Sequence, residues 1–111
     1  MTPERLRELQ DALVYGEHAS AGDASGVAWE ARTHPNYSDG WRVCIAVPAS
    51  DDVRRSIAKH RVNYRGVPVV GWTKKDDCVL FDKFVRGTQQ DAESFAREWA
   101  DKASREEPAD E

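Results

Sequence analysis

The residues best suited to binding a charged ligand form a basic run between positions 51 and 65, in a chain whose net charge is −4. The cations of this run, which outweigh Asp51 and Asp52, are Arg54, Arg55, Lys59, Arg61 and Arg65. In a helix, their spacings place Arg54, Arg61 and Arg65 along one side. Such a row can bind the phosphates of a nucleic acid or the carboxylates of an acidic protein. The simpler interpretation is a solvated helix face, because exposed helix faces are usually charged.

Aromatic side chains are the second candidate for recognition. Tyr37 lies in a predicted turn over residues 34–40, and Trp72 lies in a predicted strand whose alternation leaves one set of side chains away from the helices. Exposed rings on a sheet can stack on single-stranded bases or pack against a protein. We therefore expect Tyr37 and Trp72 to be contact residues, whereas Trp29 and Trp41 share the apolar faces of their strands and are expected in the core.

No catalytic, cofactor or metal site is predicted. His18, His34 and His60 lie in three separate predicted elements, and no further ligand follows His60 at helical spacing. Asp39 lies near His34, but no nucleophile or oxyanion feature accompanies this pair. The sequence also lacks the glycine-rich, nucleophile and zinc signatures of common enzymes. An enzyme with an unrecognised site is accordingly the third functional hypothesis.

The elements that must position these residues follow one order twice. Strand, turn, strand and helix are expected over residues 27–64 and again over residues 67–104. A first helix capped by Thr2 precedes them, joined by a flexible connector over residues 16–26, and a disordered acidic tail over residues 105–111 follows them. We predict one α+β domain over residues 1–104, arranged α-ββ-α-ββ-α, with a four-stranded, mainly antiparallel sheet packed by helices. The apolar strand over residues 78–85 is expected inside the sheet.

Size and composition limit the setting and the function. The chain has 111 residues, enough for one modest core, and has no apolar stretch that approaches the roughly 20 residues of a membrane span. We expect a cytoplasmic protein with reduced Cys44 and Cys78.

The leading functional hypothesis is a small non-catalytic binding or regulatory module that contacts another macromolecule, more readily a protein than a nucleic acid. The alternative is a nucleic-acid-binding protein that uses the basic helix over residues 51–65 with nearby aromatic side chains. An exposed sheet edge or aromatic face would also favour a homodimer.

Overall fold

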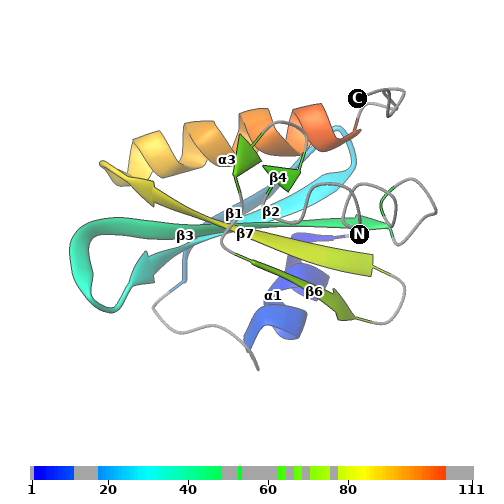
Figure 1. The fold of residues 1–111 in the computed structure, drawn as a ribbon, viewed down its shortest axis with the longest axis horizontal. Helices are drawn as coiled ribbons and strands as arrows, with labels where there is room; N and C mark the ends of the chain where they lie inside the picture. The colour runs from blue at the N-terminus through cyan, green and yellow to red at the C-terminus, as the bar shows by residue number, and fades with distance from the viewer. Residues whose placement is uncertain are drawn as a thin grey trace.

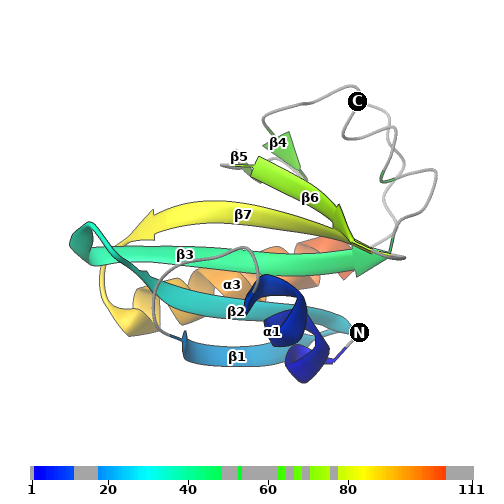
Figure 2. The same ribbon diagram turned by 90° about the horizontal axis from the view of Figure 1, so that it is seen from below.

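A computed structural model describes residues 2–11, 18–48, 53, 63–64, 67–68, 71–75 and 78–104. Its centre is a five-stranded antiparallel sheet in the order β1-β2-β3-β7-β6 (Figure 1). The strands of this sheet are β1 His18–Ala24, β2 Val27–His34, β3 Tyr37–Pro48, β6 Gly71–Lys75 and β7 Cys78–Arg86. Two short strands, β4 Asn63–Tyr64 and β5 Val67–Pro68, form a separate ladder. Helix α1, Pro3–Asp11, and helix α3, Gln89–Ser104, cover opposite faces of the sheet (Figures 1 and 2).

This arrangement confirms the predicted α+β fold and its antiparallel sheet. The four predicted sheet strands correspond to β2, β3, β6 and β7. Strand β7 lies between β3 and β6, as its two apolar faces predicted. Thr2 caps the first helix as expected, because its Oγ1 accepts a hydrogen bond from the backbone N–H of Arg5 at 3.2 Å.

The predicted connector over residues 16–26 is wrong for residues 18–24, which form strand β1 and pair with β2. Ser25 and Gly26 have φ angles of 55° and 87°, the two positive values that a two-residue type I′ hairpin turn requires. Small residues fit this strand because the ring of Trp29 lies against it. A Cβ atom at Gly22 would lie 2.8 Å from Trp29 Cζ2. Residues 16–17 lie outside the described residues.

Three predicted boundaries also differ from the structure. Only residues 35–36 form the turn between β2 and β3, because Tyr37 to Gly40 extend β3 and Gly40 pairs with Arg86 of β7. The helix predicted over residues 51–65 is wrong for Asn63 and Tyr64, because these two residues form β4 and pair with β5. The strand predicted over residues 67–73 is divided between β5 in the small ladder and β6 in the main sheet.

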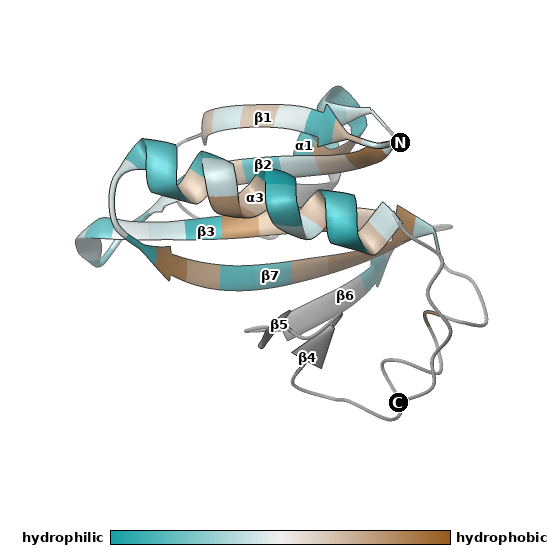
Figure 3. Ribbon diagram, turned by 90° about the horizontal axis from the view of Figure 1, so that it is seen from above, coloured by the Kyte–Doolittle hydropathy of each residue, from teal (hydrophilic) through white to brown (hydrophobic). Residues whose placement is uncertain are grey.

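Helix α3 supplies the larger core. Its apolar stripe, predicted from the spacing of Ala92, Ala96 and Trp99, is buried against the sheet, while its outer side is hydrophilic (Figure 3). Thr88 caps the helix: its Oγ1 accepts from the N–H of Asp91 at 3.1 Å, and the Asp91 carboxylate accepts from the N–H of Thr88 at 2.9 Å. The strand residues of this core are Val27, Trp29, Ala31, Val43, Ile45, Val47, Val79 and Phe81, with Val53 beside them.

The opposite face has a smaller apolar core beneath α1. Leu6 of α1 is fully buried there with Ala28, Cys44, Ala46, Cys78 and Leu80. The rest of this face, toward the β2–β3 hairpin, carries charged and aromatic side chains.

Candidate functional site

The structure places only part of the residue set that the sequence singled out. Tyr37 is 49% exposed, and it is the only exposed large apolar side chain within the described ranges. Trp72 lies in β6 at the register position opposite Phe81, and its side chain lies outside what the structure describes. The basic residues Arg54, Arg55, Lys59, Arg61 and Arg65 lie outside the described residues.

Of the two tryptophans expected in the core, Trp29 is 2% exposed. Trp41 is partly buried against the α3 core, and its Nε1 donates a hydrogen bond to the carbonyl oxygen of Gly87 at 2.8 Å.

Three rings gather at the end of the β2–β3 hairpin, and we call His34, Tyr37 and Phe84 the tip cluster. The ring centroids of His34 and Tyr37 are 5.1 Å apart, those of His34 and Phe84 are 5.3 Å apart, and those of Tyr37 and Phe84 are 5.6 Å apart. Their tilted and edge-to-face geometry is the arrangement that aromatic quadrupoles favour. The cluster therefore forms one packed unit on the surface.

The backbone of β2 and β3 builds this unit. The β2–β3 register shifts between Thr33 and His34, so that His34 pairs with Tyr37 across the turn. The Phe84 ring then lies over Gly40, where a Cβ atom would be only 2.7 Å from the ring and 2.9 Å from Tyr37 Cβ. Nδ1 of His34 accepts a hydrogen bond from the N–H of Asn36 at 3.1 Å, which orients the imidazole. The cluster thus depends on a glycine and on a shifted register.

Arg86 joins the tip cluster to a surface ion pair. Its guanidinium carbon lies 5.5 Å from the centre of the Tyr37 ring, within the range of a cation–π contact. Its Nη2 lies 3.2 Å from both carboxylate oxygens of Asp39. Both charged side chains are more than half exposed, so the ion pair itself adds little stability.

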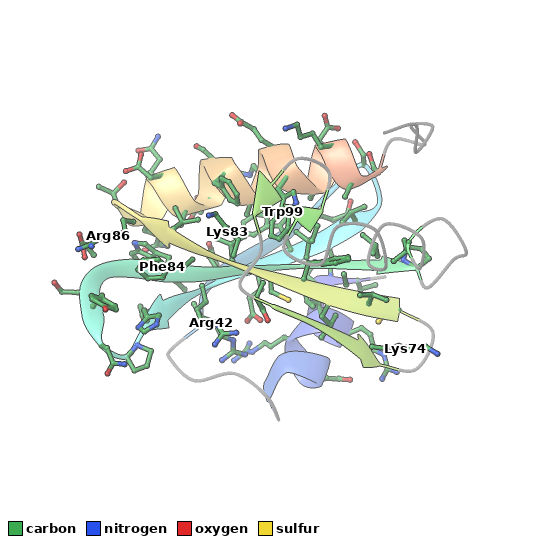
Figure 4. All side chains as sticks on the ribbon, in the orientation of Figure 1. Arg42, Lys74, Lys83, Phe84, Arg86 and Trp99 are labelled. Atoms are coloured by element: carbon green, nitrogen blue, oxygen red, sulfur yellow. The ribbon has the colours of Figure 1, made fainter. Side chains whose placement is uncertain are left out.

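Two further ion pairs continue across the same face, toward α1. Arg42 Nη2 lies 3.2 Å from Asp82 Oδ2, and Arg32 Nε lies 3.2 Å from Glu30 Oε1. The register aligns Arg32, Arg42 and Phe84 in one cross-strand row and Glu30, Cys44 and Asp82 in the next. Figure 4 shows Phe84 and Arg86 toward the hairpin end, Arg42 on the α1 side of the sheet and Lys83 on the α3 side.

Burial dominates the electrostatics of Cys44 and Asp82. Desolvation raises the pKa of Asp82, although the Arg42 guanidinium and the Cys44 thiol oppose this rise. Burial, together with the nearby Asp82 carboxylate, raises the pKa of Cys44 well above its ordinary value. Cys44 is therefore a protonated thiol at neutral pH and a poor nucleophile.

No group of three or more His, Cys, Asp or Glu side chains in the described ranges is placed to hold a metal ion. None of the helices that the structure describes is long and apolar enough to cross a membrane.

Sequence reasoning missed His34, Phe84 and Arg86 as members of this site. The alternation of β7 does place Asp82, Phe84 and Arg86 on one side, and that signal could have found Phe84 and Arg86 but not His34 of β2. It does not reveal the pairing of Gly40 with Arg86, which brings Phe84 to the hairpin end.

Comparison with known proteins gives no relative: no family model, no curated protein and no solved structure matches the chain.

Proposed function

We propose that this protein is a small non-catalytic binding module that contacts a protein partner through the tip cluster and Arg86. The observation that carries the proposal is the exposure of Tyr37 while its ring is packed against His34 and Phe84. A ring held in place before binding loses little conformational entropy when a partner covers it. Tyrosine and arginine are also enriched among residues that dominate protein interfaces. We further propose a cytoplasmic setting, where the free thiols of Cys44 and Cys78 remain reduced.

The charge balance of the site favours a protein over a nucleic acid. Within the described strands the arginines are Arg32, Arg42 and Arg86, and each of them lies beside a carboxylate. Arginines that are paired with carboxylates have little attraction for a polyanion, whose binding depends on unneutralised cations. The basic run over residues 51–65 remains an untested prediction for the nucleic-acid alternative.

The proposal is tested by quantitative affinity capture from the source cells. Wild-type protein and the variants Tyr37→Ala, Arg86→Ala and Glu98→Ala serve as baits, and isotope-labelled mass spectrometry compares the captured proteins. Glu98 is an exposed residue on α3 and provides a control on the far side of the sheet. We expect one stoichiometric partner that is retained by Glu98→Ala and reduced about tenfold or more by Tyr37→Ala and Arg86→Ala.

A partner that all three variants retain equally would contradict the proposed site. Binding of the wild-type protein to single-stranded oligonucleotides, with an affinity that falls steeply as salt rises, would instead support the nucleic-acid alternative. Circular dichroism of each bait shows that any loss of capture is not a loss of fold.

A further inference from the structure

Strand β1 forms an outer edge of the main sheet, and in the parts of the chain that the structure describes no strand pairs with its far side (Figure 3). Natural proteins usually protect such an edge with lysine, other charges, proline or a cover. The β1 sequence HASAGDA contains no Lys, Arg, Glu or Pro. Its carboxylate, Asp23, accepts a hydrogen bond from the N–H of Gly26 at 3.1 Å and is thereby held at the β1–β2 turn.

The turn geometry shows which backbone groups this edge presents. The two-residue turn at Ser25 and Gly26 makes Ala24 and Val27 the hydrogen-bonded pair that closes the hairpin. Hydrogen-bonded and non-hydrogen-bonded pairs alternate along an antiparallel ladder. Ala21 and Asp23 therefore direct their N–H and C=O groups away from β2 and toward the outer edge.

Helix α3 places a row of polar side chains along this same edge. Gln89 Nε2 donates to the carbonyl oxygen of Ala19 in β1 at 3.5 Å and to Glu93 Oε2 at 3.2 Å. The Arg97 guanidinium lies 5.7 Å from the centre of the Trp29 ring, which itself contacts β1 at Gly22. Near the end of the helix, Ser25 Oγ donates to Asp101 Oδ1 at 2.8 Å. The edge row is Gln89, Glu93, Arg97 and Asp101, at a spacing of four residues.

The edge row is self-complementary under a two-fold axis. Its contacts show that α3 runs along β1 from Ala19 to Ser25, so the middle of the row lies near Gly22. When the edge row of a second copy lies beside the first in the reverse direction, Glu93 of one copy lies opposite Arg97 of the other, and Gln89 lies opposite Asp101. A two-fold interface requires this kind of match, since the same patch must fit itself. An unrelated peptide would have no reason to match it.

We propose that a second copy of this chain adds to the sheet through β1, antiparallel and with the two-fold axis at Gly22. Ala21 of each copy then pairs with Asp23 of the other, and the two sheets become continuous. The two α3 helices lie on one face about 14 Å apart, three strand spacings, if each is centred over its β2 strand. Long Glu93 and Arg97 side chains can span this gap to each other. The surface is separate from the tip cluster and does not depend on the proposed partner.

Charge exchange on the edge row tests this dimer. Sedimentation equilibrium of the full chain over about 1–200 μM, at low salt, measures the dissociation constant. We expect a dimer for the wild type and dimerisation at least about tenfold weaker for Glu93→Arg and for Arg97→Glu, because each change sets like charges against each other. The double variant Glu93→Arg/Arg97→Glu should restore the dimer. Glu98→Arg carries the same change in charge as Glu93→Arg and should leave the dissociation constant unchanged.

Amide hydrogen exchange provides a second readout that requires no substitution. Protection of the Ala21 and Asp23 N–H groups should increase with protein concentration as the dimer forms. A wild type that is monomeric throughout the concentration range would overturn the proposal. So would a dimer in which the double exchange gives no rescue, or one in which these two amides remain unprotected.

Discussion

On the α3 face of the sheet, Trp29, Val43 and Phe81 share one apolar core with Trp99, whereas on the opposite face the same strands carry Glu30, Arg42 and Asp82. Alternation along each strand allows one backbone to serve both purposes. The α3 face is closed by a helix along much of its length. The opposite face is closed only near α1 and opens toward the tip cluster, where Tyr37 reaches solvent.

The α3 face contributes mainly to stability, and the opposite face is the one that we propose contacts a partner. Apolar burial under α3 supplies the main driving force for folding. The opposite face adds ion pairs, whose attraction is largely offset by desolvation, and rings that a partner can cover. Substitutions under α3 should therefore mainly lower the free energy of unfolding, whereas substitutions in the tip cluster should mainly weaken binding of the partner.

The largest loss of stability is expected for Trp99→Ala. Trp99 is 1% exposed and packs against Phe95 with ring centroids 5.7 Å apart. Its removal should lower the free energy of unfolding by about 3–5 kcal/mol, the usual range for a buried aromatic residue. Tyr37→Ala should lower it by only about 1 kcal/mol, because Tyr37 is half-exposed and loses mainly its ring contacts with His34 and Phe84. Urea denaturation measures both, and equal losses would remove the distinction between the two faces.

Glu30→Leu should cause the next largest loss. Glu30 is fully buried, and its carboxylate lies beside the nearly buried Arg32 guanidinium. Removing the carboxylate alone leaves that charge in a low-dielectric site and should cost about 3 kcal/mol. The double variant Glu30→Leu/Arg32→Leu should recover much of this loss, because it removes both charges. If the double variant is less stable than Glu30→Leu, the ion pair does not act as described.

Gly40→Ala should lower the free energy of unfolding by a smaller amount, because it disturbs the packing of the tip cluster alone. The added methyl group would enter the space of the Phe84 ring, and overpacking of this kind costs about 1–3 kcal/mol. The displaced ring should also weaken binding of the partner. Ser38→Ala, at an exposed position on the same hairpin, is the matched control. Equal stability of the two variants would show that Phe84 does not need the glycine.

The smallest effect is a pH dependence from Asp82. Because burial raises its pKa in the folded state, the folded protein holds this proton more tightly than the unfolded chain. Its favourable contribution is complete below the unfolded pKa and is lost as pH rises through the folded pKa. The stability of the wild type relative to Asp82→Asn should therefore decline above about pH 4. Urea denaturation of both proteins from pH 4 to pH 7 tests this, and a constant or rising difference would contradict it.

The sequence predicts the elements with strong periodicity and misses those without it. The apolar stripe of α3 and the apolar run of β7 predict these two elements directly. The alternation of β2 and β3 places Trp29 and Ile45 on one face of the sheet and Glu30 and Arg42 on the other. Strand β1 has no such signal: its residues are small because Trp29 and α3 fill the space beside it. The structure of this strand is decided by tertiary packing, not by propensity.

The candidate site was predictable only in part for a related reason. Tyr37 stands out as an aromatic residue in a polar segment, but its partners lie on other strands. Phe84 and Arg86 reach it only through the register of β3 with β7, and local patterns do not specify a register between distant strands. The match between β1 and the edge row of α3 likewise requires the packed structure.

Site-specific photo-crosslinking in cells tests the central claim most directly. A benzophenone amino acid is placed at Tyr37 in one variant and at Glu98, on the far side of the sheet, in another. The account predicts that the Tyr37 position forms a crosslink to one partner protein and that the Glu98 position does not. Equal crosslinking to that protein from both positions, or from Glu98 alone, would contradict the assignment of the tip cluster as the partner-binding surface.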